Sequence, residues 1–228
     1  MVFQRFEPAL FQFLEELADH NHRPWFQENK VRYEQEVLEP SLAFIRACAP
    51  QLKEISPFFV ASDRRIGGSL MRVYRDTRFS KDRTPYKTNV GIQFRHELGG
   101  DVHAPGFYVH IAPGECFLAL GVWRPDAAAL AQIRAAIIDA PDRWRRARDN
   151  RKFRQHFALD GDSLKGPPRG YPPDHPLIDD LKRTDFVALR DVSEHDVLAE
   201  SYLERTMAAF AASRPFMQFL CSALRLPF

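Results

Sequence analysis

The feature that most limits the fold is a change of hydrophobic period in the middle of the chain. Towards both ends, apolar residues recur at helical spacing. In the middle, residues 71–74, 90–94 and 107–111 alternate apolar with polar side chains, and residues 116–123 are continuously apolar. Short connections rich in turn residues favour antiparallel pairing of these segments. We therefore predict an α+β fold in which a mostly antiparallel sheet of four to five strands is packed by N-terminal and C-terminal helices.

The same pattern predicts the domain organisation. Residues 1–228 are expected to form a single domain, because this length suits one well-buried core and no linker interrupts it. Within it, residues 1–55 should be helical, residues 68–124 should form the sheet core, and residues 126–228 should be helical again. A loop rich in glycine and proline is expected at 161–176, and its length suggests a function.

Individual residues refine this plan. Asn21 is expected to cap the start of a helix, and Pro40 to kink or break the helix in which it lies. Ser193 should cap a helix that reaches Phe210. Residues 186–189 are expected to form an edge strand.

Composition excludes several classes of protein. The net charge is only +2, so any affinity for nucleic acid would have to come from a local patch. The three cysteines lie far apart and form no CxxC pair, so neither a disulfide framework nor a metal site is indicated. The longest apolar run, residues 116–123, is too short to cross a membrane, and acidic residues interrupt any signal-peptide core. We expect a soluble, cytoplasmic protein without a membrane partner.

Residues 72–88 are the most informative stretch for function. From Arg64 to Lys87 there are eight Lys or Arg residues and only two Asp or Glu, with aromatic residues and a proline between them. Guanidinium groups bind oxyanions in a planar, bidentate manner, so this stretch predicts a site for a phosphate-bearing or other anionic ligand. The residues expected to bind it are Arg72, Arg75, Asp76, Arg78, Lys81, Tyr86 and Lys87.

Two other interpretations stay open. The chain could be a nucleic-acid-binding module that uses the basic residues at 64–87 and 143–154, the second of which holds seven basic residues and one acidic residue. It could also be a structural or interaction domain with an internal arginine network. A pocket formed by the side chains of 72–88 would favour an enzyme, a groove continuous with 143–154 would favour nucleic acid, and buried mutual ion pairs would favour the structural role.

Catalysis is less well specified than binding. Tyr108 and His110 share one face of a predicted strand, which implies a wet or cleft-lining sheet face, and such a pair could perform acid–base chemistry. Asp76 is the third candidate; we expect it to be ionised, paired with an arginine, and to orient that arginine. Phosphate-loop, dinucleotide-binding and hydrolase motifs are absent, so neither a reaction nor a cofactor is identified.

The chain resembles an uncharacterised family, the domain of unknown function 2461, over nearly its whole length. The residues that carry the resemblance are Asn21, Trp25 and Phe26, the run Arg75-Asp76-x-Arg78-Phe79-Ser80, and the run Pro85-Tyr86-Lys87-Thr88. His20 stands where paired asparagines would be expected. The resemblance implies no activity, ligand or catalytic residue.

Overall fold

The computed structural model describes residues 3–76, 78, 82–99 and 104–228, and these contain a six-stranded antiparallel sheet with the strand order β1-β2-β3-β4-β6-β5. The α+β class is confirmed. The sheet has six strands rather than four to five, because β1 and β5 are too short for alternation to reveal them. The strands are β1 (Phe59–Val60), β2 (Val90–His96), β3 (Gly106–Ala112), β4 (Glu115–Val122), β5 (Ala158–Asp160) and β6 (Phe186–Val192).

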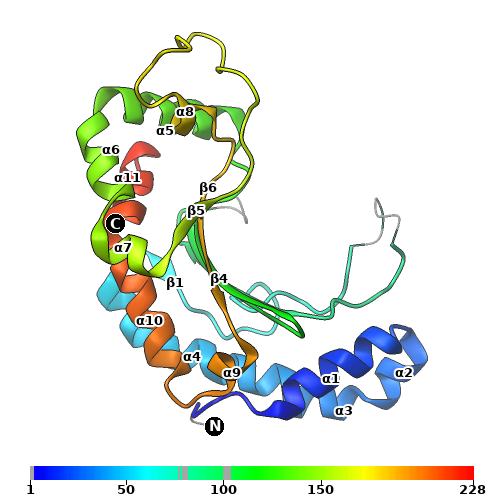
Figure 1. Cartoon of the computed structure of the whole chain (residues 1–228). Helices are drawn as coiled ribbons and strands as arrows, with labels where there is room; N and C mark the ends of the chain where they lie inside the picture. The colour runs from blue at the N-terminus through cyan, green and yellow to red at the C-terminus, as the bar shows by residue number, and fades with distance from the viewer. Residues whose placement is uncertain (1–2, 77, 79–81, 100–103) are drawn as a thin grey trace.

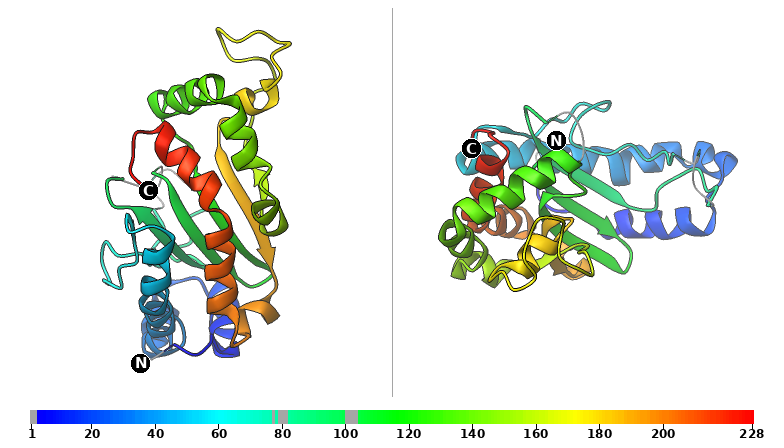
Figure 2. Two further views of the ribbon diagram at one scale, coloured as in Figure 1. Left: turned by 90° about the vertical axis from the view of Figure 1, so that its left-hand side faces the viewer. Right: turned by 90° about the horizontal axis from the view of Figure 1, so that it is seen from above.

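Helices gather on one face of this sheet. In Figures 1 and 2, α4, α10 and α11 run along that face, while α1, α2 and α3 extend beyond one end of the strands and the loop at 161–176 projects at the other. None of the described helices is both long and apolar enough to cross a bilayer. The helices are α1 (Pro8–Asp19), α2 (Arg23–Glu28), α3 (Lys30–Arg32), the π-helix η1 (Tyr33–Leu38), α4 (Glu39–Ile55), α5 (Ala127–Asp139), α6 (Pro141–Arg148), α7 (Arg151–His156), α8 (Ile178–Lys182), α9 (Glu194–Leu198), α10 (Tyr202–Ala212) and α11 (Arg214–Ala223).

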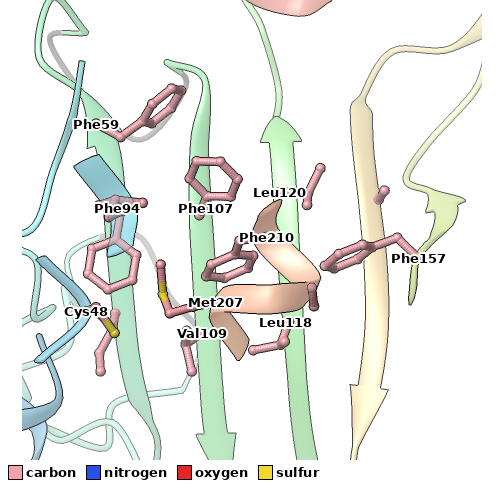
Figure 3. Close-up of a cluster of buried hydrophobic side chains, with 14 of the residues drawn as sticks. Cys48, Phe59, Phe94, Phe107, Val109, Leu118, Leu120, Phe157, Met207 and Phe210 are labelled. Carbon is pink, nitrogen blue, oxygen red and sulfur yellow. The ribbon is translucent and has the colours of Figure 1, made fainter. Parts of the chain in front are cut away.

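The main core lies between the sheet and these helices. Alternate residues of the strands, among them Phe94, Phe107 and Leu120, point towards α10 and are buried (Figure 3). The ring of Phe107 packs at 4.8 Å from that of Phe210 on α10. Burying each such side chain stabilises the fold by about 1.5–3 kcal/mol relative to exposure. The remaining alternate residues point to the opposite face, which we call the open face.

The stretch at 71–74 is not a strand, so that prediction was wrong. The one bridge within 71–74 joins Tyr74 to Tyr86, and Leu70, just before the stretch, forms another with Ile92. The backbone N–H of Arg75 donates to the carbonyl of Pro85 and that of Lys87 donates to the carbonyl of Val73, at 2.9 and 2.7 Å. The stretch therefore pairs mainly with the chain that returns beside it. We call residues 70–88 the basic arm.

The prediction of an edge strand at 186–189 was also wrong. These residues begin β6, which pairs with β4 on one side and with β5 on the other. Strand β5, only three residues long, is the edge strand at this end. Its pairing depends on a contact between distant parts of the chain, which local alternation cannot reveal.

The helical predictions need two corrections. Ser193 does cap a helix, but this helix, α9, ends at Leu198 and a separate helix, α10, begins at Tyr202. Pro40 neither breaks nor ends its helix, because it lies in the first turn of α4, directly after the π-helix η1. The wider π turn accommodates a residue that lacks an N–H and whose ring crowds the preceding turn.

Candidate ligand sites on the open face and the basic arm

Small residues hollow out the open face. The strand register places Tyr108, Ala119 and Leu189 in one row across β3, β4 and β6. Gly106, Gly121 and Val187 form a second row on the same face. Cross-strand partners share a face of the sheet, so these side chains form one surface. Where a row contains glycine or alanine, no large side chain covers the backbone, and the surface is concave there.

The result is a hollow of about 520 Å³, which we call the sheet hollow. Gly106, Ala119 and Gly121 lie at its base. Gly121 is required there, because its φ is +118° and an added Cβ would lie 2.1 Å from the carbonyl oxygen of Phe186. The other lining residues are Met71 from the basic arm, Gln93, Ala104, Tyr108, Phe117, Leu120, Trp123, Asp160, Gly161, Val187 and Leu189.

Tyr108 and His110 form a hydrogen-bonded pair beside this hollow. The Tyr108 hydroxyl lies 3.0 Å from Nδ1 of His110, whose ring stacks on Phe117 with centroids 4.6 Å apart. Gly91 makes room for the pair, since a Cβ there would lie 2.8 Å from the Tyr108 hydroxyl oxygen. Burial raises the pKa of Tyr108 to about 12 and lowers the pKa of His110. Both groups are therefore uncharged near neutral pH.

Two ion pairs hold the guanidinium groups of Arg75 and Arg78 in the basic arm. Asp76 accepts hydrogen bonds from Nε and Nη2 of Arg78, at 2.9 and 2.7 Å, and this interaction lowers the pKa of Asp76 to about 2. Arg75 pairs with Asp82 through Nη1 alone, and this nitrogen also donates to the Thr84 hydroxyl. The predicted pairing of Asp76 with an arginine is confirmed. Because all four side chains are at least 40% exposed, these are surface pairs, which contribute little to stability.

Arg72 and Lys87 differ from Arg75 and Arg78 in that no described carboxylate pairs with them directly, although the charge of Asp76 attracts Arg72. Among the described residues, neither side chain forms a hydrogen bond or an ion pair. Lys87 is half-buried, and its pKa is lowered first by desolvation and then by the charges of Arg72 and Arg75. The arm thus brings three cations together while leaving the ammonium group of Lys87 poorly solvated.

Tyr86 anchors the arm to the N-terminal helices. Its ring is only 2% exposed and stacks on Phe26 at 4.1 Å. The side-chain amide of Asn21 donates to the carbonyl of Tyr86 and accepts from its N–H, both at 3.0 Å. The cap of α2 is His22 rather than Asn21, because Nδ1 of His22 accepts from the N–H of Trp25. Asn21 therefore positions the arm.

The predicted site residues thus fall into two groups. Arg72, Arg75, Asp76, Arg78, Tyr86 and Lys87 belong to the arm, and Lys81 lies outside the described residues. Tyr108 and His110 belong to the open face. Sequence reasoning missed Gly106, Gly121 and Asp160; the alternate small residues Ala119 and Gly121 of β4 were a partial signal, but they do not by themselves reveal the hollow.

A second hollow, of about 540 Å³, lies between α1 and the turn from β3 to β4. Its lining includes Glu15, Asp19 and Glu115, so it is acidic. In the part of the chain that the structure describes, no group of three His, Cys, Asp or Glu side chains is arranged to hold a metal ion.

The second basic stretch, 143–154, lies on α6 and α7. Figure 1 shows these helices on the helical side of the sheet and the basic arm on the other side. Arg148 is engaged by Asp149 and Asp180, and Arg145 by Asp142. The two basic stretches therefore do not form one continuous groove.

The fold and these sites describe an α+β protein with helices on one face of its sheet and a hollow and a basic arm on the other. The chain belongs to the family described as "Conserved hypothetical protein (DUF2461)", which matches residues 9–219 and confirms the resemblance. No curated protein matches the chain, and no solved structure matches it.

Proposed function

We propose that the protein binds a phosphate-bearing or similar anionic small molecule at the basic arm, through Lys87 and Arg72 with Arg75 close by. The observation that carries the proposal is the partly buried charge of Lys87, with which no carboxylate in the described ranges forms an ion pair. An ammonium group that is partly desolvated and surrounded by like charges is less stable than in water. An oxyanion between Lys87 and Arg72 would relieve both costs and gain charge-assisted hydrogen bonds.

The other residues of the arm act as supports in this proposal. Asp82 and Asp76 hold the guanidinium groups of Arg75 and Arg78, and Tyr86 fixes the arm against α2. Asp76 suits orientation better than general-base catalysis, because a carboxylate with a pKa of about 2 is a weak base near neutral pH.

The test is to titrate the protein with inorganic phosphate and with tripolyphosphate. Binding is measured by calorimetry and by the rise in melting temperature. Lys87→Met and Arg72→Gln should each weaken tripolyphosphate binding at least tenfold, while Lys152→Gln, an exposed change on α7, should not. Without ligand, Lys87→Met should melt no lower than the wild type, because the change removes a desolvated charge. Equal losses in all three variants, or no saturable binding by the wild type, would overturn the proposal.

The pH dependence gives an independent readout. The pKa of Lys87 in the free protein lies below that of an ordinary lysine, and a bound anion would raise it again. Affinity should therefore be full at pH values below the pKa of Lys87 in the free protein and fall as the pH rises through its pKa in the complex. This decline should start at a lower pH than for an ordinary lysine and should disappear in Lys87→Met.

A further inference from the structure

The sheet hollow differs in chemistry from the basic arm. We infer that it is a second binding site, for a flat, uncharged ring compound that carries a hydrogen-bonding heteroatom. This inference goes beyond the proposed function and does not depend on it.

The shape of the hollow favours a flat ligand. Its volume of about 520 Å³ lies within the range of about 300–1,000 Å³ that is usual for small-molecule sites. Gly106, Ala119 and Gly121 carry no side-chain atom beyond Cβ, so the floor is close to the plane of the backbone. A ring can lie on this floor with Phe117 and Leu189 beside it.

The charge of the lining favours an uncharged ligand. Of the lining residues within the described ranges, Asp160 alone has a carboxyl group and none has a basic side chain, so the lining offers no cation to an anionic ligand. Most of the other walls are apolar, and burying a charge against apolar walls without a partner is costly. The anion proposed for the basic arm is therefore disfavoured in the hollow.

Tyr108 supplies a hydrogen bond to the ligand in either arrangement of its pair with His110. If the hydroxyl donates to Nδ1, the phenol oxygen still has a lone pair to accept from a ligand N–H. If Nδ1 donates to the phenol oxygen, the hydroxyl proton is available for a ligand acceptor. Because both groups are neutral near pH 7, this contact costs no charge separation.

The three tryptophans allow the site to be observed directly. Trp123 lines the hollow and is 47% exposed, whereas Trp144 is buried against α11 and Phe186 of β6, and Trp25 packs beside Phe13 on α1. In protein labelled with 5-fluorotryptophan, fluorine NMR should give three resonances, and Trp123→Phe identifies the resonance of Trp123.

The probe is isoquinolin-1-one, a flat, neutral lactam with one donor and one acceptor. It should shift the Trp123 resonance in a saturable way and leave the other two unchanged. Ala119→Phe, which fills the hollow from its floor, should weaken binding at least tenfold. Ala128→Phe, the same change at an exposed position of α5, should not alter it. Tyr108→Phe should weaken binding about 3–10-fold, the effect of one lost hydrogen bond.

Several results would overturn the inference. One is the absence of a saturable shift at millimolar probe, and another is unchanged binding by a folded Ala119→Phe. If Ala119→Phe does not fold, the titration of the wild-type protein decides. A probe that shifts the resonance of Trp25 or Trp144, and not that of Trp123, would overturn the inference. A dimer in sedimentation equilibrium that Ala119→Phe dissociates would assign the hollow to a second copy instead. Lys87→Met should leave probe binding unchanged, so failure here and failure of the anion site are distinguishable.

Discussion

Asn21 shows how one side chain can fix the position of a functional segment. Its amide occupies both backbone hydrogen-bonding groups of Tyr86, which lies 65 positions later in the chain. Tyr86 in turn is adjacent to Lys87, the residue on which the proposed anion site depends.

Asn21→Ala should therefore reduce stability, because it leaves two backbone groups of a buried residue unpaired. The expected loss in free energy of unfolding is about 1–3 kcal/mol, measured by urea denaturation. Asn89→Ala is the matched control, since Asn89 is half-buried but forms no side-chain hydrogen bond within the described residues, and its change should stay within about 0.5 kcal/mol. Equal effects of the two changes would contradict the anchoring role of Asn21.

Asp76 should behave differently from Asn21. Its pKa is depressed, so its pair with Arg78 stabilises the fold above the ordinary aspartate pKa and loses that contribution as the pH falls towards about 2. Because the pair is exposed, Asp76→Asn should scarcely change the unfolding midpoint at pH 7 but should flatten the acid limb of the stability profile. A large loss of stability at pH 7 would instead show a structural role for the pair.

At the scale of elements, two helix starts make a natural comparison. Ser193 and Asp196 form a reciprocal capping box at α9, in which the pKa of Asp196 is lowered to about 2 by its bonds to Ser193. Ser201 precedes α10 but makes no capping hydrogen bond with its side chain. Ser193→Ala should cost about 1 kcal/mol in chemical denaturation. Ser201→Ala should change stability by less than about 0.5 kcal/mol, and a reversed order would refute this assignment.

The strands that could be predicted from sequence are those in which one face is buried. Residues 90–94 and 107–111 alternate because every second side chain is buried beneath the helices, and period is a local property of the sequence. Strand order is not local, so the inner position of 186–189 in the sheet was missed. Residues 71–74 alternate as well, yet Val73 and Tyr74 pair with residues 86–87 of the same arm, and Met71 forms only one backbone hydrogen bond to β2.

For the candidate sites, too, local features of the sequence could be predicted and contacts between distant segments could not. The shared face of Tyr108 and His110 could be predicted from the period of two, and the excess of basic residues on the arm from simple counting. The hollow could not, because it needs Gly106, Gly121 and Val187 from three strands to fall in one row. The absence of an ion pair between Lys87 and any described carboxylate likewise depends on the three-dimensional structure.

At the scale of the whole molecule, the separation of the two basic stretches bears on nucleic acid. A partner that neutralises many phosphates must present its cations on one surface, and here the arm and α6–α7 lie on opposite sides of the sheet. Labelled duplex should therefore bind weakly, with a slope of log affinity against log salt no steeper than about −2. Arg151→Gln, on α7, should leave this slope unchanged. A slope steeper than about −5 that Arg151→Gln reduces would restore the nucleic-acid interpretation.

The lengths of the outermost strands bear on how the protein behaves at high concentration. Strand β1 has two residues and β5 has three, whereas the inner strands have seven or eight. A sheet whose long strands are inside and whose short strands are at the rims offers little backbone on which another chain could add a strand. The order β1-β2-β3-β4-β6-β5 therefore protects this fold against growth of the sheet from molecule to molecule, which is the first step towards fibrils.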